Sequence, residues 1–347
     1  MNTDHFPAAS IPDLDANLRL PNRIGFSNPI WSVAGGKGGT GKSVITANLS
    51  LGMAIMGYEV VVIDGDLGAP NLHNCLNKKR PRYTLNDFIM GKVKNLQDIV
   101  LETPLKNLKF ISGGTALLSM ANLPHARKEK ILRHINDLTA DLILVDLGAG
   151  TTYNTLDFFN LSDQGIIVCN PEPNAKYDAF YFLKNAIFRR LTRFFPKATL
   201  FQQMMDDYLK NSGDNKLEIT KFLLYLEKEN PELLLEIESI LKGFTPRLIM
   251  NKVRNREQIR EGDWFVNLVK NYLMVEMEYC GHVEFDKKVM YASEQMIPFL
   301  FSYPKCDAAK CMYQLIERLN PRRRRTPINS FRRFRQELQN YSSVWSD

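Results

Sequence analysis

The sequence predicts an α/β fold in which a mostly parallel central sheet carries helices on both faces. Short apolar or β-branched runs alternate with helical segments from residue 30 to about residue 320 of the 347-residue chain. The first run, Ile30–Ala34, leads directly into a segment with the spacing Gly-x4-Gly-Lys-Ser. A strand, this loop and a helix in that order are typical of the P-loop NTPase fold.

The loop has the composition of a phosphate-binding site for ATP and Mg²⁺. Small residues let several backbone N–H groups converge on a phosphate at the start of the next helix, expected from Ser43 to Met56. Lys42 is expected to reach the β- and γ-phosphates, and the Ser43 hydroxyl to bind Mg²⁺. The predicted loop consists of Gly36, Lys37, Gly38, Gly39, Thr40, Gly41, Lys42 and Ser43.

Lys37 is a second lysine in a loop that needs only one. The run Lys-Gly-Gly-Thr-Gly-Lys-Ser resembles the deviant Walker A loop of the MinD/ParA family of ATPases. In that family the early lysine contacts the phosphates bound to a partner subunit. The resemblance therefore implies an ATP-dependent homodimer in which Lys37 acts in trans, as an arginine finger does. A Lys37 that merely faces solvent is the alternative.

Two acidic segments follow predicted strands. Val60–Ile63 has the pattern of a buried parallel strand and is followed by Asp64-Gly65-Asp66. This segment is similar to the family's switch I, which implies that Asp66 positions the attacking water and that Asp64 lies near the Mg²⁺ ion. An ordinary acidic turn is the alternative.

The second acid, Asp146, is the last residue of the predicted strand Leu142–Asp146. Its carboxylate matches the Walker B pattern and is expected to hold Mg²⁺ or its water. The glycines that follow, in Leu147-Gly148-Ala149-Gly150, resemble switch II and let the backbone rearrange. Leu147 departs from relatives that carry a small polar residue or proline there.

Two later strands complete the resemblance. The predicted strand Gln164–Cys169 is followed by Asn170-Pro171-Glu172-Pro173, and then by a helix expected from Asn174 to Phe195. With Asp178-Ala179, this segment resembles the branch that contains FlhG, also called FleN. The strand from Arg247 to Lys252 contains Asn251, at a position where an Asn of this family recognises the adenine edge. An ordinary Asn at a strand end is the alternative.

The chain divides into a leader, a large domain and a tail. Residues 1–29 are expected to be a flexible leader, and residues 30–320 an ATPase domain. Residues 198–245 are expected to form a helical insertion, in three pieces with apolar residues at helical spacing. Self-packing and a partner-docking surface are both open interpretations of it. The pieces are Phe201–Leu209, Leu217–Glu227 and Pro231–Leu241.

Residues 321–347 form a basic tail with seven Arg against Glu337 and Asp347, or 7 − 2 = +5 of the formal net charge of +7. The apolar side chains share one helical face, as in helices that lie in the plane of a membrane. Membrane binding through residues 328–345, docking on protein, and nucleic-acid binding are the three interpretations, in decreasing preference. The face carries Phe331, Phe334, Leu338, Tyr341 and Trp345.

Composition places the protein among soluble globular chains, with 44% hydrophobic and 24% charged residues. The five cysteines favour reduced thiols in a cytosol, and the five dispersed histidines show no zinc-binding spacing. The expected location is cytoplasmic, with peripheral attachment to a membrane.

The expected function is that of an Mg²⁺-dependent ATPase which dimerises with ATP, cycles on and off a membrane, and positions cargo such as a flagellar or division-site assembly. An unidentified protein partner is expected to set its slow turnover. The alternatives are a ParA-like DNA-partitioning ATPase, an electron- or cluster-transfer ATPase similar to the nitrogenase iron protein, and a module that uses ATP only to dimerise.

Overall fold

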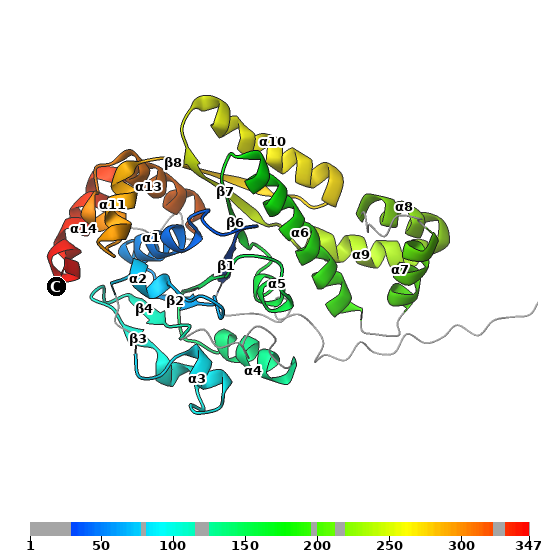
Figure 1. Ribbon diagram of the computed structural model, residues 1–347, viewed down its shortest axis with the longest axis horizontal. Coiled ribbons are helices and arrows are strands. Elements are labelled where there is room, and N and C mark those ends of the chain that lie inside the picture. Colours follow the sequence, from blue (N-terminus) through cyan, green and yellow to red (C-terminus); the bar gives the residue numbers. More distant parts are fainter. Residues whose placement is uncertain are drawn as a thin grey trace, which may run out of the picture.

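The computed structural model describes residues 29–77, 81–114, 125–195, 200–211, 219–321 and 330–346 (Figure 1). The expected leader therefore lies outside the described residues except for Pro29. The arginine run at residues 322–325 lies outside them as well.

The core is one eight-stranded sheet with the order β3-β4-β2-β5-β1-β6-β7-β8. Every neighbouring pair is parallel except β3 and β4, which are antiparallel. The mostly parallel α/β fold predicted from the sequence is confirmed. The strands are β1 (Ile30–Ala34), β2 (Val60–Asp64), β3 (Leu101–Glu102), β4 (Leu108–Ile111), β5 (Leu142–Asp146), β6 (Ile166–Cys169), β7 (Arg247–Val253) and β8 (Glu278–Glu284).

Alternate residues of each strand enter two separate cores, as the two-residue period of a strand requires. Val61 and Ile63 of β2 belong to one core, and Val60 and Val62 belong to the other. The first core is covered by α3 (Leu85–Ile89), α4 (His125–Asn136), α5 (Tyr153–Phe159), α6 (Pro173–Phe194) and α10 (Arg256–Leu273).

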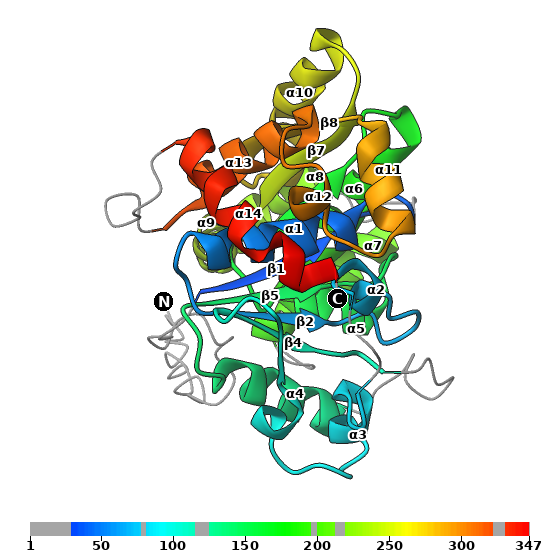
Figure 2. The same ribbon diagram turned by 90° about the vertical axis from the view of Figure 1, so that its left-hand side faces the viewer.

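The second core is covered by α1 and by the C-terminal helices, as Figure 2 shows. α1 begins one residue earlier than the sequence predicted, at Lys42, because Gly41 is the left-handed residue that precedes it. The helices on this side are α1 (Lys42–Ile55), α2 (Leu72–Cys75), α11 (Lys287–Glu294), α12 (Phe299–Ser302), α13 (Asp307–Leu319) and α14 (Phe331–Ser346).

The carboxyl ends of the central strands meet at one edge of the sheet. Asp64 pairs in register with Asp146, and Asp146 with Val33. The end of β1, from which the glycine loop leaves, therefore lies beside both acids. This edge is where open α/β sheets bind their ligands.

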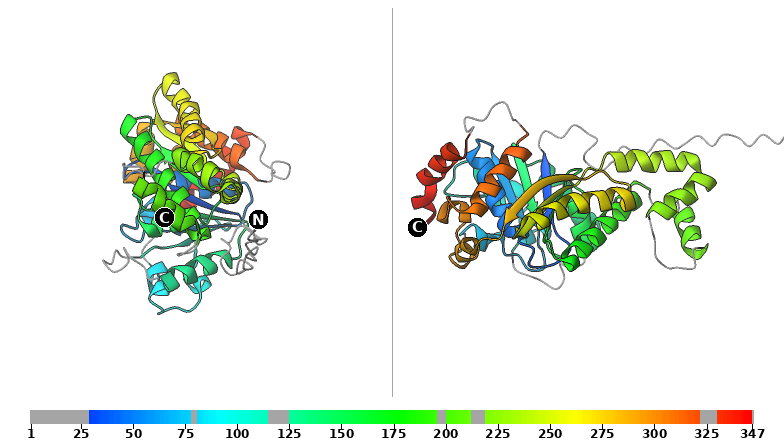
Figure 3. Two further views of the ribbon diagram at one scale, coloured as in Figure 1. Left: turned by 90° about the vertical axis from the view of Figure 1, so that its right-hand side faces the viewer. Right: turned by 90° about the horizontal axis from the view of Figure 1, so that it is seen from above.

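Three helices project from one end of the molecule (Figure 3). They are α7 (Leu200–Asn211), α8 (Ile219–Glu229) and α9 (Pro231–Lys242), and they confirm the helices predicted between residues 201 and 241. Their apolar stripe is buried: Phe201, Phe222 and Ile237 join the core that contains α6. The self-packing interpretation of this segment therefore holds for that stripe.

The apolar face of α14 packs on the protein itself. Phe334, Leu338 and Trp345 are at most 2% exposed. The Trp345 ring lies 5.0 Å from that of Phe301 in α12, and the Phe334 ring lies 5.1 Å from that of Tyr313 in α13. In this conformation the stripe docks on protein, which was the second interpretation of the sequence. No helix among the described residues combines the length and the apolar character needed to cross a membrane.

The first testable prediction concerns the packing of α6 on the sheet. Phe182 is fully buried, with its ring 5.0 Å from the edge-on ring of Phe159. Phe182→Ala should lower the free energy of unfolding by about 3–5 kcal/mol, because it removes a large buried ring and leaves a cavity. Urea denaturation measures the change. The neighbouring Tyr181 is 47% exposed, so Tyr181→Ala should change stability by about 0.5 kcal/mol or less. Equal losses in both variants would contradict this packing.

Candidate functional site

The glycine loop between β1 and α1 is pressed against the backbone of α6. A Cβ atom added at Gly36 would lie 2.1 Å from the carbonyl carbon of Asp178 and 2.4 Å from the amide nitrogen of Ala179. Backbone atoms cannot rotate away as the end of a side chain can. Gly36 is therefore required for this close approach.

The other end of the loop is held by the last residues of β7. The Asn251 side-chain amide donates to the Thr40 carbonyl at 2.7 Å, and the Lys252 ammonium donates to the Gly39 carbonyl at 2.7 Å. Gly39 and Gly41 adopt φ of 80° and 90°, in the region that glycine tolerates. The loop is thus clamped at both ends.

Lys42 points back into the loop. Its ammonium donates to the Lys37 carbonyl at 3.3 Å, and its side chain is buried. Burial lowers the pKa of Lys42, an effect that the charges of Asp146 and Asp66 oppose. Lys37 itself is half-buried. The trans role predicted for it stays a prediction, since it requires a second chain.

The residues predicted to hold Mg²⁺ lie around the same strand ends. Thr46 donates to Asp146 at 3.0 Å, and the Ser43 hydroxyl donates to Asn71 at 3.0 Å. Asp64 accepts the backbone N–H groups of Asp66 at 3.2 Å and of Leu72 at 3.0 Å.

The electrostatics of the two acids fit a cation. Burial raises the pKa of Asp146 to about 6, while the nearby Ser43 hydroxyl, the hydrogen bond from Thr46 and the charge of Lys42 lower it. Burial, with the neighbouring charge of Asp146, also raises the pKa of Asp64. Two buried carboxylates that disfavour each other's ionised form, beside a hydroxyl, are a suitable oxygen donor set for Mg²⁺.

Asp66 lies against the loop that follows β5. Its carboxylate accepts the N–H groups of Gly68 at 3.1 Å and of Ala69 at 2.9 Å. A Cβ atom at Gly148 would lie 2.8 Å from the same carboxylate. Asp66, Gly148 and Thr152 are among the residues that line a small cavity of ≈ 140 Å³. The two predicted switch segments therefore touch at the carboxylate that was predicted to position water.

A larger cavity of ≈ 300 Å³ lies between the start of α1 and the residues at the ends of β7 and β8. Its size and mostly apolar walls suit a nucleotide base. Asn251 lines this cavity, its amide donates to the Thr40 carbonyl, and its side-chain oxygen accepts the Lys252 N–H at 2.9 Å. The base-binding role expected for Asn251 stays a prediction. The remaining walls include Val44, Ile45, Lys252, Val283, Glu284, Phe285, Asp286, Val289, Met290 and Phe299.

Sequence reasoning missed several of these residues. Lys252 adopts a left-handed φ of 59°, which turns it out of β7 towards the loop. Its position directly after Asn251 was the available signal. Phe285 and Asp286 follow β8 and carry no motif. Their place in the ≈ 300 Å³ cavity emerges only from the neighbouring positions of β7 and β8 in the sheet.

Comparison with known proteins gives a family match over most of the chain. The model of the CobQ/CobB/MinD/ParA nucleotide binding domain matches residues 31–299. The chain is 30% identical over 166 residues to antiactivator FleN of Pseudomonas aeruginosa, across 47% of this chain and 58% of FleN. It is 33% identical over 188 residues to the flagellum site-determining protein YlxH of Helicobacter pylori, across 48% of this chain and 60% of YlxH. The chain thus spans about three-fifths of the length of these curated relatives.

A solved structure supports the fold. The septum site-determining protein MinD of Pyrococcus horikoshii, complexed with Mg-ADP, superposes with a TM-score of 0.58 at 20% identity. The superposition covers 85% of this chain and 96% of that one. At this identity the likeness establishes a shared fold.

The clamp on the loop is testable in the nucleotide-free protein. Gly36→Ala should lower the free energy of unfolding by about 1–3 kcal/mol, because the added methyl overlaps the α6 backbone. Gly38→Ala is the matched control, since nothing lies within 4 Å of a Cβ at Gly38. Its effect should stay below about 0.5 kcal/mol. Urea denaturation of both variants measures the free energy of unfolding. A Gly36→Ala protein as stable as the control would contradict the clamp.

Proposed function

The chain belongs to the CobQ/CobB/MinD/ParA nucleotide-binding family, and from this premise we propose that it is an Mg²⁺-dependent ATPase that works as a dimerising switch. The observation that carries the proposal is the contact of Asp66 with Gly148. It joins the carboxylate that would orient water to the loop after the Mg²⁺-binding strand. A change in the segment of Asp66 on hydrolysis would therefore alter the conformation of the loop at Gly148.

In this proposal each residue has a role that its position supports. The loop N–H groups and Lys42 bind the phosphates of ATP, and the ≈ 300 Å³ cavity receives its base. Ser43, Asp64 and Asp146 hold Mg²⁺, which neutralises charge on the phosphates. Asp66 orients the attacking water in the ≈ 140 Å³ cavity.

Lys37 supplies a second positive charge at the phosphates, which the pocket of a single chain would lack. The ammonium of Lys42 is buried inside the loop at the Lys37 carbonyl, and the proposal already gives it the γ-phosphate of its own chain. We assign Lys37 to the phosphates of a second protomer, where it stabilises the transferring phosphoryl group. ATP then holds two protomers together until hydrolysis separates them.

We further propose that α14 attaches the dimer to the cytoplasmic face of a membrane. Two features of the docked helix support its release from the protein surface. The buried indole N–H of Trp345 has no hydrogen-bond acceptor among the described residues, and Arg332 and Arg333 are exposed. A lipid headgroup region offers acceptors to the indole and anions to the arginines. Two such helices in one dimer bind with avidity that a single helix lacks.

The cargo belongs to the same proposal. YlxH is named for determining a flagellum site and MinD for determining a septum site. We propose that this chain positions an assembly of that kind, with a protein partner that stimulates hydrolysis. The projecting helices α7, α8 and α9 expose Leu224 and Leu235, which suits them to a partner contact.

The trans role of Lys37 can be tested by mixing two inactive variants. Lys37→Ala and Asp66→Ala should each hydrolyse ATP at least about 100-fold more slowly than the natural chain. In a mixed dimer, the Asp66→Ala chain donates an intact Lys37 to the pocket whose Asp66 is intact. An equal mixture should therefore recover about a quarter of the natural activity, because half of randomly formed dimers are mixed and each has one complete pocket.

Phosphate release from each variant and from the mixture gives the readout. The control adds an ATP-binding-deficient Lys42→Ala chain to the Lys37→Ala chain in place of Asp66→Ala, and size-exclusion chromatography follows dimer formation. A mixture of Lys37→Ala and Asp66→Ala that stays as inactive as its parts would place Lys37 in its own pocket and overturn the trans assignment.

Release of α14 can be tested without changing the helix. Tyr313→Ala removes a ring that lies 5.5 Å from that of Phe331 and 5.1 Å from that of Phe334. Docking should weaken, so the fraction that sediments with anionic phospholipid vesicles without nucleotide should rise several-fold. Tyr272→Ala, at a tyrosine 60% exposed on α10, is the control. A chain ending at Asn320 that sediments as well as the full chain would refute membrane attachment through α14.

A further inference from the structure

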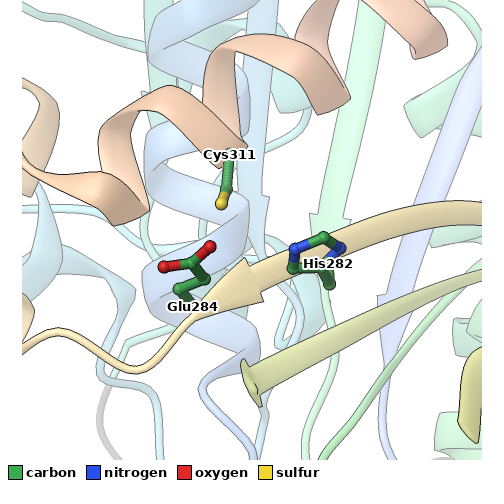
Figure 4. Close-up of side chains that lie close together, drawn as sticks. All are labelled: His282, Glu284 and Cys311. Atoms are coloured by element: carbon green, nitrogen blue, oxygen red, sulfur yellow. The ribbon is translucent and has the colours of Figure 1, made fainter. Parts of the chain in front are cut away.

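A cluster of candidate metal ligands lies where the end of β8 meets α13 (Figure 4). His282, Glu284 and Cys311 each offer one donor atom, and the three atoms all lie within 4.8 Å of one another. In the described part of the chain, this is the one group of three or more His, Cys, Asp or Glu residues with donors so close together. We propose that the cluster binds Zn²⁺.

The fold brings the three residues together from two elements. His282 and Glu284 are two apart on β8, so they project to the same side of the strand. Cys311 comes from α13, which packs along β8. Because β8 is the edge strand, the half-exposed His282 and the exposed Glu284 leave an entry path for an ion.

The donor set selects the kind of metal. Imidazole nitrogen, thiolate sulfur and carboxylate oxygen are all ligands of Zn²⁺, whereas Mg²⁺ and Ca²⁺ take oxygen ligands. Bonds to Zn²⁺ of about 2.0–2.3 Å place tetrahedral donors about 3.5 Å apart. Movements of about 1 Å at the side-chain ends, which the exposed Glu284 and half-exposed His282 allow, close the set. The thiol proton passes to solvent when the ion binds.

Three protein ligands leave the fourth position of a tetrahedral ion to water. Glu284 also lines the base cavity, between Val283 and Phe285. A bound ion would therefore tie the wall of that cavity to α13, the helix against which α14 packs. Metal and nucleotide affinities would then be coupled, and reciprocally so. The coupling rests on the proposed function, whereas the metal site does not.

The site is testable in the full-length, nucleotide-free protein after treatment with a chelator. Co²⁺ is the spectroscopic probe, since a sulfur ligand gives a thiolate-to-cobalt charge-transfer band that the all-oxygen site of Ser43, Asp64 and Asp146 cannot produce. The natural chain should show this band at one Co²⁺ per chain, and Zn²⁺ should abolish it by displacing the more weakly bound ion.

Ligand variants and matched controls decide the outcome. Cys311→Ser should remove the band, and His282→Ala and Glu284→Gln should each weaken Co²⁺ binding at least about 10-fold. Cys306→Ser and Glu278→Gln, at the start of the same helix and on the same strand, should leave it unchanged. If Cys311→Ser fails to fold, the Co²⁺ affinity of His282→Ala tests the site in its place. A natural chain without the band at saturating Co²⁺, or a band that survives Cys311→Ser or depends on Cys306, overturns the proposal.

Discussion

The nucleotide site depends on one steric constraint, the fixing of the loop backbone between two elements that contact its opposite ends. Gly36 meets the α6 backbone at a distance that leaves no room for a Cβ atom, and Asn251 and Lys252 hold the carbonyls of Thr40 and Gly39. Close-packed backbone contacts of this kind are nearly incompressible, so the loop backbone moves little. The loop backbone, with its N–H groups, is thereby ordered before a ligand arrives. Ligand binding then need not supply the free energy of ordering it.

This rigidity holds three ionisable side chains where burial disfavours their charged forms until a ligand compensates it. Burial lowers the pKa of Lys42 and raises those of Asp64 and Asp146, so each of the three is held in a setting that disfavours its charged form. Anionic phosphates favour the lysine cation, and a divalent ion favours the carboxylates. A ligand that carries both stabilises all three charged forms at once, and the folded state gains stability by linkage.

The fold and the centre of the site were predictable because strand ends in a parallel sheet share an edge. Asp64, Asp146 and the glycine loop each follow an apolar run, so their proximity followed from topology. The Lys252 contact was not predictable, since it depends on a left-handed residue within β7. Neither was the trio of His282, Glu284 and Cys311, whose members lie on a strand and a helix that meet only in the folded chain. For α14 the stripe was predictable but its partner surface was not, because aromatic side chains suit protein and lipid alike.

That ambiguity is itself a physical property of α14. The face that carries Phe334, Leu338 and Trp345 is buried against α12 and α13, so it cannot contact lipid at the same time. For the proposed membrane attachment to occur, the free energy of membrane binding must therefore exceed that of docking, to which each buried apolar side chain contributes about 2 kcal/mol. A single helix meets that threshold poorly, whereas two helices on one ATP-bound dimer share a single loss of translational freedom. In the proposed cycle, the docked stripe would thus make attachment depend on pairing, and pairing would depend on the phosphates bound by the clamped loop.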